Sequence, residues 1–249
     1  MVEPKLPDIV TLLADAYKSH PIAKYLYSFQ DAIYSLIIVL ILTLLAIFAS
    51  RKHELIPGSR LQNAAEAIVG GIDDFVCGIL GPKGRRFTPF IGTLFIYILC
   101  MNLFGLIPFM KSATSSWSTT FGLAVCVFCY VQYTAVREMG FLGYMDHLAG
   151  KPRGIMAFSV VLPLLILVLH IISEFIKPIS LSLRLRSNIW GEDLLLAVLA
   201  SFGVKGVGLL LFNMLASVLT AVVQAVVFAL LSTIYFALAL GEEANEDIA

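Results

Sequence analysis

The sequence predicts an all-α integral membrane protein with about five membrane-crossing helices and one interfacial amphipathic helix. Hydrophobic residues make up 59% of the 249 positions and charged residues only 14%, an apolar share well above that of ordinary soluble domains. The apolar residues are gathered in long runs, and a helix of about 20 apolar residues crosses a hydrocarbon layer about 30 Å thick. Because backbone exposed to lipid must be helical or closed in a barrel, runs of this length predict helices.

Three runs of ordinary span length come first, and two longer runs follow. We place the crossings at residues 32–50, 87–110, 117–136, 155–202 and 206–240. At about 1.5 Å per residue the last run would reach about 50 Å, so it must tilt steeply or protrude. Two long runs in succession predict a slanted helical hairpin.

The segment 61–80, between the first two crossings, has a mixed character. It interleaves Glu66, Asp73 and Asp74 with large aliphatic and aromatic residues. This pattern is typical of an amphipathic helix that lies at the membrane surface and does not cross it.

Charge placement predicts the orientation of the chain. Lys plus Arg and Asp plus Glu balance at 17 each, so net charge favours neither nucleic acid nor an acidic partner. The loops 51–86 and 137–154 share one side and hold nine Lys and Arg residues, whereas the segments of the other side hold five. The positive-inside rule places these loops in the cytoplasm, residues 1–31 outside and the acidic tail 241–249 inside.

Three cations, Lys177, Arg184 and Arg186, lie within the fourth apolar region. An arginine near the bilayer centre costs about 2.5–3.5 kcal/mol on insertion scales, and its guanidinium cannot lose its proton to avoid that cost. One alternative is a helix-end arginine that extends toward the interface, but helix is expected to continue on both sides of Arg184. We therefore expect a site that needs a permanent positive charge.

Polar residues follow one face of this fourth helix. At about 100° per residue, six side chains fall near the direction of Arg184. They are His170, Ser173, Glu174, Lys177, Asn188 and Glu192. Pro178 could kink the helix within this stripe. Arg186 and Asp193 fall on the opposite face, two turns apart, where they could neutralise each other.

The last helix has a gentler ridge of polar residues, Asn213, Ser217, Thr220 and Gln224, at spacings of four, three and four. Since polar residues in membranes normally face protein or water-filled cavities, the two ridges indicate the walls of an aqueous or hydrogen-bonded route. The alternative is structural: Ser and Thr bond back to their own helix, and Asn and Gln join helices. A satisfied interior histidine is likewise the alternative for His170.

These residues together resemble a known family. The run Lys177-Pro-Ile-Ser-Leu-Ser-Leu-Arg184-Leu-x-x-Asn188, followed by Glu192 and Asp193, resembles the signature of subunit a of F-type ATP synthases. Gln224 matches the glutamine of that family's last helix. The segment 102–108, Asn-Leu-Phe-Gly-Leu-Ile-Pro, is similar to its second-span motif.

The resemblance implies the non-catalytic stator subunit of a proton-driven rotor, in which Arg184 is the essential charge that faces the carboxylates of a rotating ring of c subunits. Two offset half-channels would connect the ring to the two sides of the membrane. The external half-channel would be lined by Asn188, Glu192, Asp193, Asn213, Ser217 and Gln224. The cytoplasmic half-channel would be lined by His170, Ser173 and Glu174.

The resemblance also implies the partners: the c ring, the peripheral-stalk b subunits, the rest of the ATP synthase complex and the lipid bilayer, without nucleic acid. We expect no nucleotide, cofactor or metal in this chain. A bacterial inner (plasma) membrane is favoured, with an organelle membrane as the alternative.

The chain departs from the family at two places. The family usually continues Leu-Phe-Gly-Asn after the arginine, whereas this chain has Leu185-Arg186-Ser187-Asn188, and our hypothesis is that Asp193 offsets Arg186. Ser217 stands where histidine or glutamate is frequent, which suggests that Glu192 or Asp193 carries more of the external proton traffic.

Two other classes of function are open. A secondary transporter or channel could use Arg184 to bind an anionic substrate, although matched internal repeats are missing from the sequence. A membrane metalloenzyme would need clustered ligands, whereas His20, His53, His147 and His170 are widely dispersed.

Overall fold

The computed structural model describes residues 22–50, 60–107, 112–148 and 158–240, together with Thr11 and Met110, and it is helical without strands over these ranges. In chain order the elements are α2 (Ile22–Ser50), α3 (Arg60–Leu80), η1 (Pro82–Arg86), α4 (Thr88–Phe104), η2 (Ala113–Ser115), α5 (Trp117–Leu148), α6 (Phe158–Ser201), η3 (Gly203–Gly206) and α7 (Val207–Leu240).

The prediction of an all-α membrane protein is confirmed. Among the described residues, four helices are long and apolar enough to cross a membrane: Phe29–Phe48, Trp117–Gly140, Leu164–Ser201 and Val207–Ala239. Thr88–Phe104 is a shorter apolar helix. The amphipathic α3 is not among the candidate spans of the described chain.

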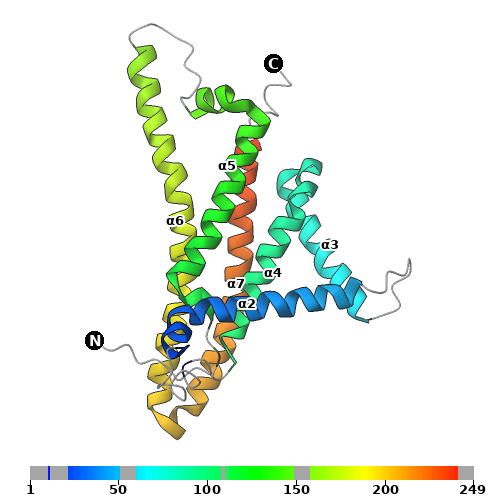
Figure 1. Ribbon diagram of the computed structural model, residues 1–249, viewed down its shortest axis with the longest axis vertical. Helices are drawn as coiled ribbons and strands as arrows, with labels where there is room; N and C mark the ends of the chain where they lie inside the picture. The colour runs from blue at the N-terminus through cyan, green and yellow to red at the C-terminus, as the bar shows by residue number, and fades with distance from the viewer. Residues whose placement is uncertain are drawn as a thin grey trace.

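Helices α5, α6 and α7 run alongside one another, α4 packs against α7, and α2 runs across their axes (Figure 1). The main core lies between α4, α5 and α7 and includes the fully buried Ile98, Val127 and Phe228. Helix α6 adds Leu181 and Leu185 to it. The Phe87 and Phe236 rings stack here with their centroids 4.5 Å apart.

Helix α4 is shorter than the crossing expected at 87–110, because its helical structure ends at Phe104 although the apolar sequence continues. The chain returns so closely that a Cβ on Gly105 would lie 2.6 Å from the Cβ of Ser112. The Ser112 hydroxyl donates to the backbone carbonyl of Met101 at 3.1 Å. The same carbonyl accepts the Gly105 N–H at 3.4 Å, so the returning loop adds a second hydrogen bond at the helix C-terminus, where intrahelical donors run out.

Helix α5 is longer than the crossing expected at 117–136 and continues to Leu148. Its regular dihedrals are interrupted at Gly140 (φ 71°, ψ 162°), a conformation that glycine adopts at little cost because it has no Cβ. The segment beyond Gly140 therefore leaves the axis of the crossing (Figure 1), and the Tyr144 hydroxyl within it donates to Gln132 on the crossing itself.

Helix α6 is one continuous helix of 44 residues, and Pro178 does not interrupt it. At about 1.5 Å per residue it is about 66 Å long. The turn to α7 depends on Gly203, whose φ is 58°, and on Gly206, where a Cβ would lie 2.8 Å from the Leu199 carbonyl oxygen. These glycines allow α6 and α7 to form a tight hairpin.

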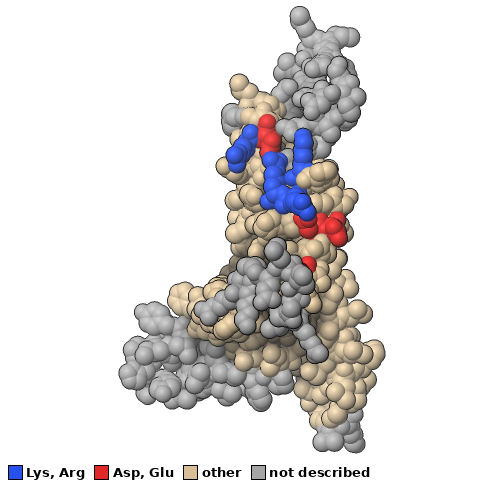
Figure 2. Space-filling model, turned by 90° about the vertical axis from the view of Figure 1, so that its right-hand side faces the viewer, with Lys and Arg blue, Asp and Glu red and all other residues tan. Residues whose placement is uncertain are grey.

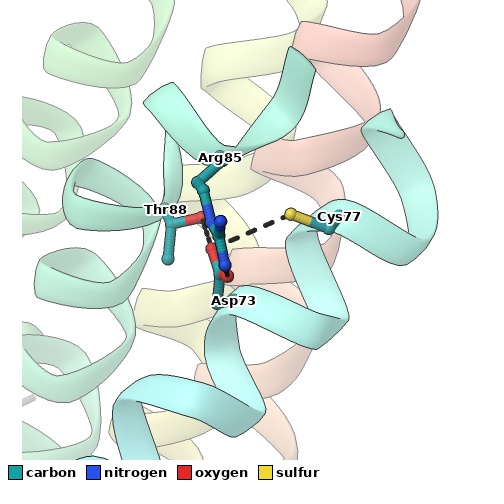
Figure 3. A network of polar contacts seen from close by, with 4 residues as sticks. All are labelled: Asp73, Cys77, Arg85 and Thr88. Atoms are coloured by element: carbon teal, nitrogen blue, oxygen red, sulfur yellow. Dashed lines mark hydrogen bonds and ion pairs between the residues drawn. The ribbon is translucent and has the colours of Figure 1, made fainter. Parts of the chain in front are cut away.

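Helix α3 is fixed to η1 and α4 through Asp73 (Figure 3). The Arg85 Nε donates to Asp73 Oδ2 at 3.1 Å, and the Thr88 hydroxyl donates to Asp73 Oδ1 at 2.8 Å. The Cys77 thiol is a weaker third donor at 3.8 Å. The Thr88 and Arg85 hydrogen bonds hold the pKa of the Asp73 carboxyl below its usual value.

Candidate functional site

Arg184 projects from the outer face of α6. Its side chain is exposed, and so are those of Leu183 and Ile179 on the same helix, at 43% and 44%. Leu181 and Leu185 are buried in the core and set the rotation of the helix. Within the described part of the chain, no carboxylate forms an ion pair with Arg184. The structure therefore presents an uncompensated cation on an apolar surface.

A polar contact links α6 to α7. Asn188 Nδ2 donates to Gln224 Oε1 at 2.7 Å. Two members of the predicted external set, Asn188 and Gln224, are thus brought into direct contact.

A cavity of about 20 Å³ lies between α4, α6 and α7 on the C-terminal side of Arg184 along α6. It is lined by Asn102, Gly105, Leu106, Ser112, Ile189, Glu192, Asp193, Leu196 and Ser217. Three members of the predicted external set, Glu192, Asp193 and Ser217, therefore share one cavity. The sixth, Asn213, is buried on α7 but does not line it.

Buried polar atoms in and near this cavity lack protein partners. Asn102 Nδ2, Glu192 Oε1, Asn213 Nδ2 and Gln224 Nε2 are buried without a hydrogen-bond partner in the described chain. Such atoms are rare in folded proteins, and a polar cavity of more than about 10–15 Å³ can hold a water molecule that satisfies them. The arrangement can therefore hold water between an amide donor and a carboxylate acceptor.

Sequence reasoning missed the contribution of α4 and the following loop to this cavity. Asn102 is only 3% exposed, and its Oδ1 accepts a 2.9 Å hydrogen bond from the Thr114 hydroxyl. With that oxygen engaged, the amide nitrogen is the free group. An asparagine within an apolar run was the available signal, because such a residue seldom faces lipid.

A second polar cluster surrounds Glu174, on the N-terminal side of Arg184. Gln132 Nε2 on α5 donates to Glu174 Oε2 at 2.7 Å, and Lys177 Nζ forms an ion pair with Glu174 Oε1. The Tyr144 hydroxyl donates to Gln132 Oε1. The Lys177 ammonium lies 5.4 Å from the ring centroid of Tyr235 on α7.

Of the three residues predicted for the cytoplasmic side, Glu174 lies at the centre of this cluster. His170 and Ser173 have exposed side chains on α6. Gln132, Tyr144 and Tyr235 lie on other helices, and the one-helix face analysis could not place them beside Glu174.

Arg186 has a partner that the sequence did not indicate. Its guanidinium carbon lies 5.2 Å from the ring centroid of Trp117 at the start of α5, within the range of a cation–π interaction. Its Nε is buried without a hydrogen-bond partner among the described residues. Its proposed neutralisation by Asp193 stays a prediction.

A metal centre finds no support in the described ranges, where no three His, Cys, Asp or Glu side chains are placed to hold an ion together.

Comparison with known proteins gives the family. The family model described as "ATP synthase A chain" matches residues 32–237. The chain belongs to the ATP synthase subunit a family. Among its relatives, "ATP synthase subunit a" of Protochlamydia amoebophila is 38% identical over 253 residues, covering 98% of this chain and 92% of that protein.

Other bacterial members of the subunit a family are also similar over most of their length. The protein of Solidesulfovibrio magneticus is 36% identical, with 92% of this chain and 94% of that protein covered. The protein of Helicobacter pylori is 33% identical, with 87% and 93% covered. The chain is thus a membrane subunit of the ATP synthase complex.

Proposed function

We propose that this chain is the stator that conducts protons through two offset half-channels to and from the carboxylates of a rotating c ring. The observation that carries the proposal is the exposed Arg184 on the apolar face of α6. A permanent charge in such a place needs a partner, and the described chain offers none. A membrane carboxylate on another subunit would supply it.

The surface around Arg184 is suited to another protein or to lipid. Near Arg184 on α6, Ile176 and Leu183 are 55% and 43% exposed, and farther along the hairpin Phe212 and Leu215 of α7 are each 71% exposed. Continuous apolar surface of this kind is unusual on a protein that stays uncovered in water. We assign the part that carries Arg184 to the c ring and leave the remainder to lipid and to the peripheral-stalk b subunits.

The fixed charge of Arg184 would couple proton flow to rotation. A cation beside a ring carboxylate favours its ionised form, so a proton leaves that carboxylate as it approaches Arg184. The same charge repels protons and opposes a direct connection between the half-channels. Each elementary charge that crosses the membrane gains about 2.3 kcal/mol per 100 mV, which rotation would pass to the catalytic part of the complex.

The two polar clusters support separate half-channels. The Glu174 cluster and the cavity at Glu192 lie on opposite sides of Arg184 along α6, and buried apolar residues come between them in the chain. These are Leu181 and Leu185 on α6 and Phe228 on α7. A proton would therefore have no continuous polar route through this packed part of the chain and would have to travel on the ring.

The arrangement of the helices supports the orientation. If the 20 residues Phe29–Phe48 of α2 stand upright, they span about 30 Å, and α6, at about 66 Å, must lie strongly inclined because α2 runs across it (Figure 1). Lys and Arg side chains gather on the face to which α3 projects (Figure 2), and Lys83, Arg85 and Arg86 of η1 are exposed. The positive-inside rule assigns that face to the cytoplasm of a bacterial inner membrane, with the N-terminus outside.

The test uses inverted membrane vesicles that contain the whole complex with Arg184→Ala. We expect ATP-driven acidification to be lost while the complex still assembles with its c ring, because the ring carboxylate no longer meets a fixed cation. Ser187→Ala, an exposed position on the same helix, is the matched control and should pump like the wild type. Wild-type pumping by the Arg184→Ala complex would refute the proposal.

The family assignment argues against the alternative, a transporter for an anionic substrate. Such a protein would also purify without a c ring, so the subunits that co-purify with this chain give a second, independent check.

A further inference from the structure

We propose that Gln132 and Tyr144 of α5 are positioning residues of the cytoplasmic half-channel, which together orient the Glu174 carboxylate as the proton-accepting group between α5, α6 and α7. The inference deepens the proposed function and rests on it. It assigns a role to a helix that the polar stripes of α6 and α7 do not include.

Both oxygens of the Glu174 carboxylate are engaged, each by a different kind of donor. Oε2 accepts the 2.7 Å hydrogen bond from Gln132, and Oε1 pairs with the Lys177 ammonium. The Glu174 and Lys177 side chains are only 21% and 23% exposed. Since a contact from the same helix and a contact from a neighbouring helix act on one carboxylate, its position is determined relative to both helices.

The orientation of the Gln132 amide depends in turn on Tyr144. The Tyr144 hydroxyl donates to Gln132 Oε1, which leaves the amide NH₂ group to donate to Glu174. Burial and the nearby Glu174 charge raise the pKa of the Tyr144 hydroxyl, so it keeps its proton and remains a donor. Gln132 has no proton to exchange, and its role is therefore to hold the carboxylate.

The space beside Glu174 fits this role. A cavity of about 10 Å³ is lined by Glu174, Lys177 and Tyr235, by apolar residues of α5 and by Pro178 and Leu181 of α6. Glu174 is the only acid in that lining. The volume of the cavity is at the lower limit for one water molecule. A proton that enters the cavity therefore meets the Glu174 carboxylate as its acidic acceptor group.

Among the described residues, Lys177 and Tyr235 are further charged and titratable groups near Glu174, and Tyr235 also lies within reach of the Arg184 charge. Lys177 lies between the carboxylate and the Tyr235 ring, with its ammonium 5.4 Å from the ring centroid. The three helices thus contribute Tyr144, the Glu174–Lys177 pair and Tyr235 to one cluster, and a change at Gln132 acts on the centre of it.

The experiment compares Gln132→Leu, Tyr144→Phe and the double variant in inverted vesicles that contain the whole complex. The loss of one hydrogen bond to a charged group corresponds to a change of roughly tenfold to a hundredfold, so we expect Gln132→Leu to slow ATP-driven acidification by about that factor. Tyr144→Phe should have a smaller effect. Because Tyr144 acts through Gln132, the double variant should be no slower than Gln132→Leu alone.

Two further measurements, the pH profile of pumping and the amount of assembled complex, distinguish a positioning role of Gln132 from a role in folding alone. The pH profile of pumping, varied on the cytoplasmic side, should move in Gln132→Leu and stay in place in the control Tyr133→Phe, an exposed tyrosine on the same helix. A role in folding alone would lower the amount of assembled complex without moving the profile, and that result would overturn the inference, as would wild-type pumping by Gln132→Leu. Arg184→Ala is measured in parallel. If Arg184→Ala abolishes pumping while Gln132→Leu has no effect, this inference fails and the proposed function stands. Unchanged pumping by Arg184→Ala would refute the proposed function itself.

Discussion

Arg184 and Leu185 are neighbours in sequence but have opposite environments. The buried residues of this part of α6 form one stripe, which includes Leu181, Leu185 and Ile189. On an ideal helix Arg184 lies about 115° from the centre of that stripe, so burial of the leucines turns the guanidinium outward. At the scale of the residue, core packing is what makes the charge available to a partner.

Arg186 gives the prediction at this scale. We expect Arg186→Phe to destabilise the assembled complex, because it removes the cation that contacts Trp117 and that our hypothesis pairs with Asp193. Asp193→Asn should cost less in the Arg186→Phe background than in the wild type, with a coupling of about 0.5–3 kcal/mol. Thermal stability of the detergent-solubilised complex, measured for the two single variants and the double variant, provides the cycle.

Pumping is not the readout for this cycle, since Asp193 lies on the proposed external path. Additive effects of the two changes would show that Asp193 does not offset Arg186 and would leave Trp117 as its demonstrated partner.

At the scale of the element, the helices are joined by a few polar contacts at defined positions. Asn188 with Gln224 fixes α6 to α7, Gln132 with Glu174 fixes α5 to α6, and the Asp73 network fixes α3 to η1 and α4. A buried polar group without its partner is costly, so such contacts favour one register of helices whose apolar surfaces alone would permit several.

The anchoring of α3 should depend on pH. The folded-state pKa of Asp73 lies below its ordinary value of 3.8, so its contribution to stability is complete above that ordinary value and is lost as the pH falls through the lowered one. We therefore expect α3 and η1 to exchange amide hydrogens faster in acid, relative to α4, than at neutral pH. Hydrogen–deuterium exchange on the solubilised complex measures this.

Asp73→Asn should show the faster exchange already at neutral pH, because the amide lacks the charge that pairs with Arg85. Asp74→Asn, an exposed neighbour, is the control and should behave like the wild type. Equal protection of α3 in Asp73→Asn and wild type would contradict the anchoring role.

At the scale of the whole molecule, the steep angle between α2 and the helices α5, α6 and α7 decides how the protein can sit in a membrane (Figure 1). Helices of about 30 Å and about 66 Å that cross each other cannot both stand upright in one bilayer. An inclined α6–α7 hairpin presents a long lateral face to a partner within the membrane, as contact with a rotating ring requires.

The orientation predicts the side from which two positions can be labelled. In a background without the native cysteines, Lys83→Cys should react with a membrane-impermeant maleimide in inverted vesicles but not in intact spheroplasts. Ser118→Cys, near the opposite end of the crossings, should show the reverse pattern. Both native side chains are exposed, so a shared pattern of labelling would contradict the proposed orientation.

The sequence alone determined the fold class and the family, and it singled out Arg184 for the proposal. These depend on properties that are local in the chain: long apolar runs, the cost of a guanidinium in a membrane, and a motif of twelve neighbouring positions, 177–188. Glu192, Asp193 and Ser217, which the sequence predicted for one path, line one cavity, and their role in proton conduction stays a prediction. Helical periodicity suffices for residues that share a helix or a simple hairpin.

Only the tertiary structure decided which residues from different helices meet. It ended α4 at Phe104, brought Asn102 to the cavity at Glu192, placed Trp117 under Arg186 and set Gln132 and Tyr144 beside Glu174. These contacts depend on the rotation, register and crossing angle of whole helices, which follow from the packing of all the apolar side chains together. A periodicity read along one helix has no information about the helix that packs against it.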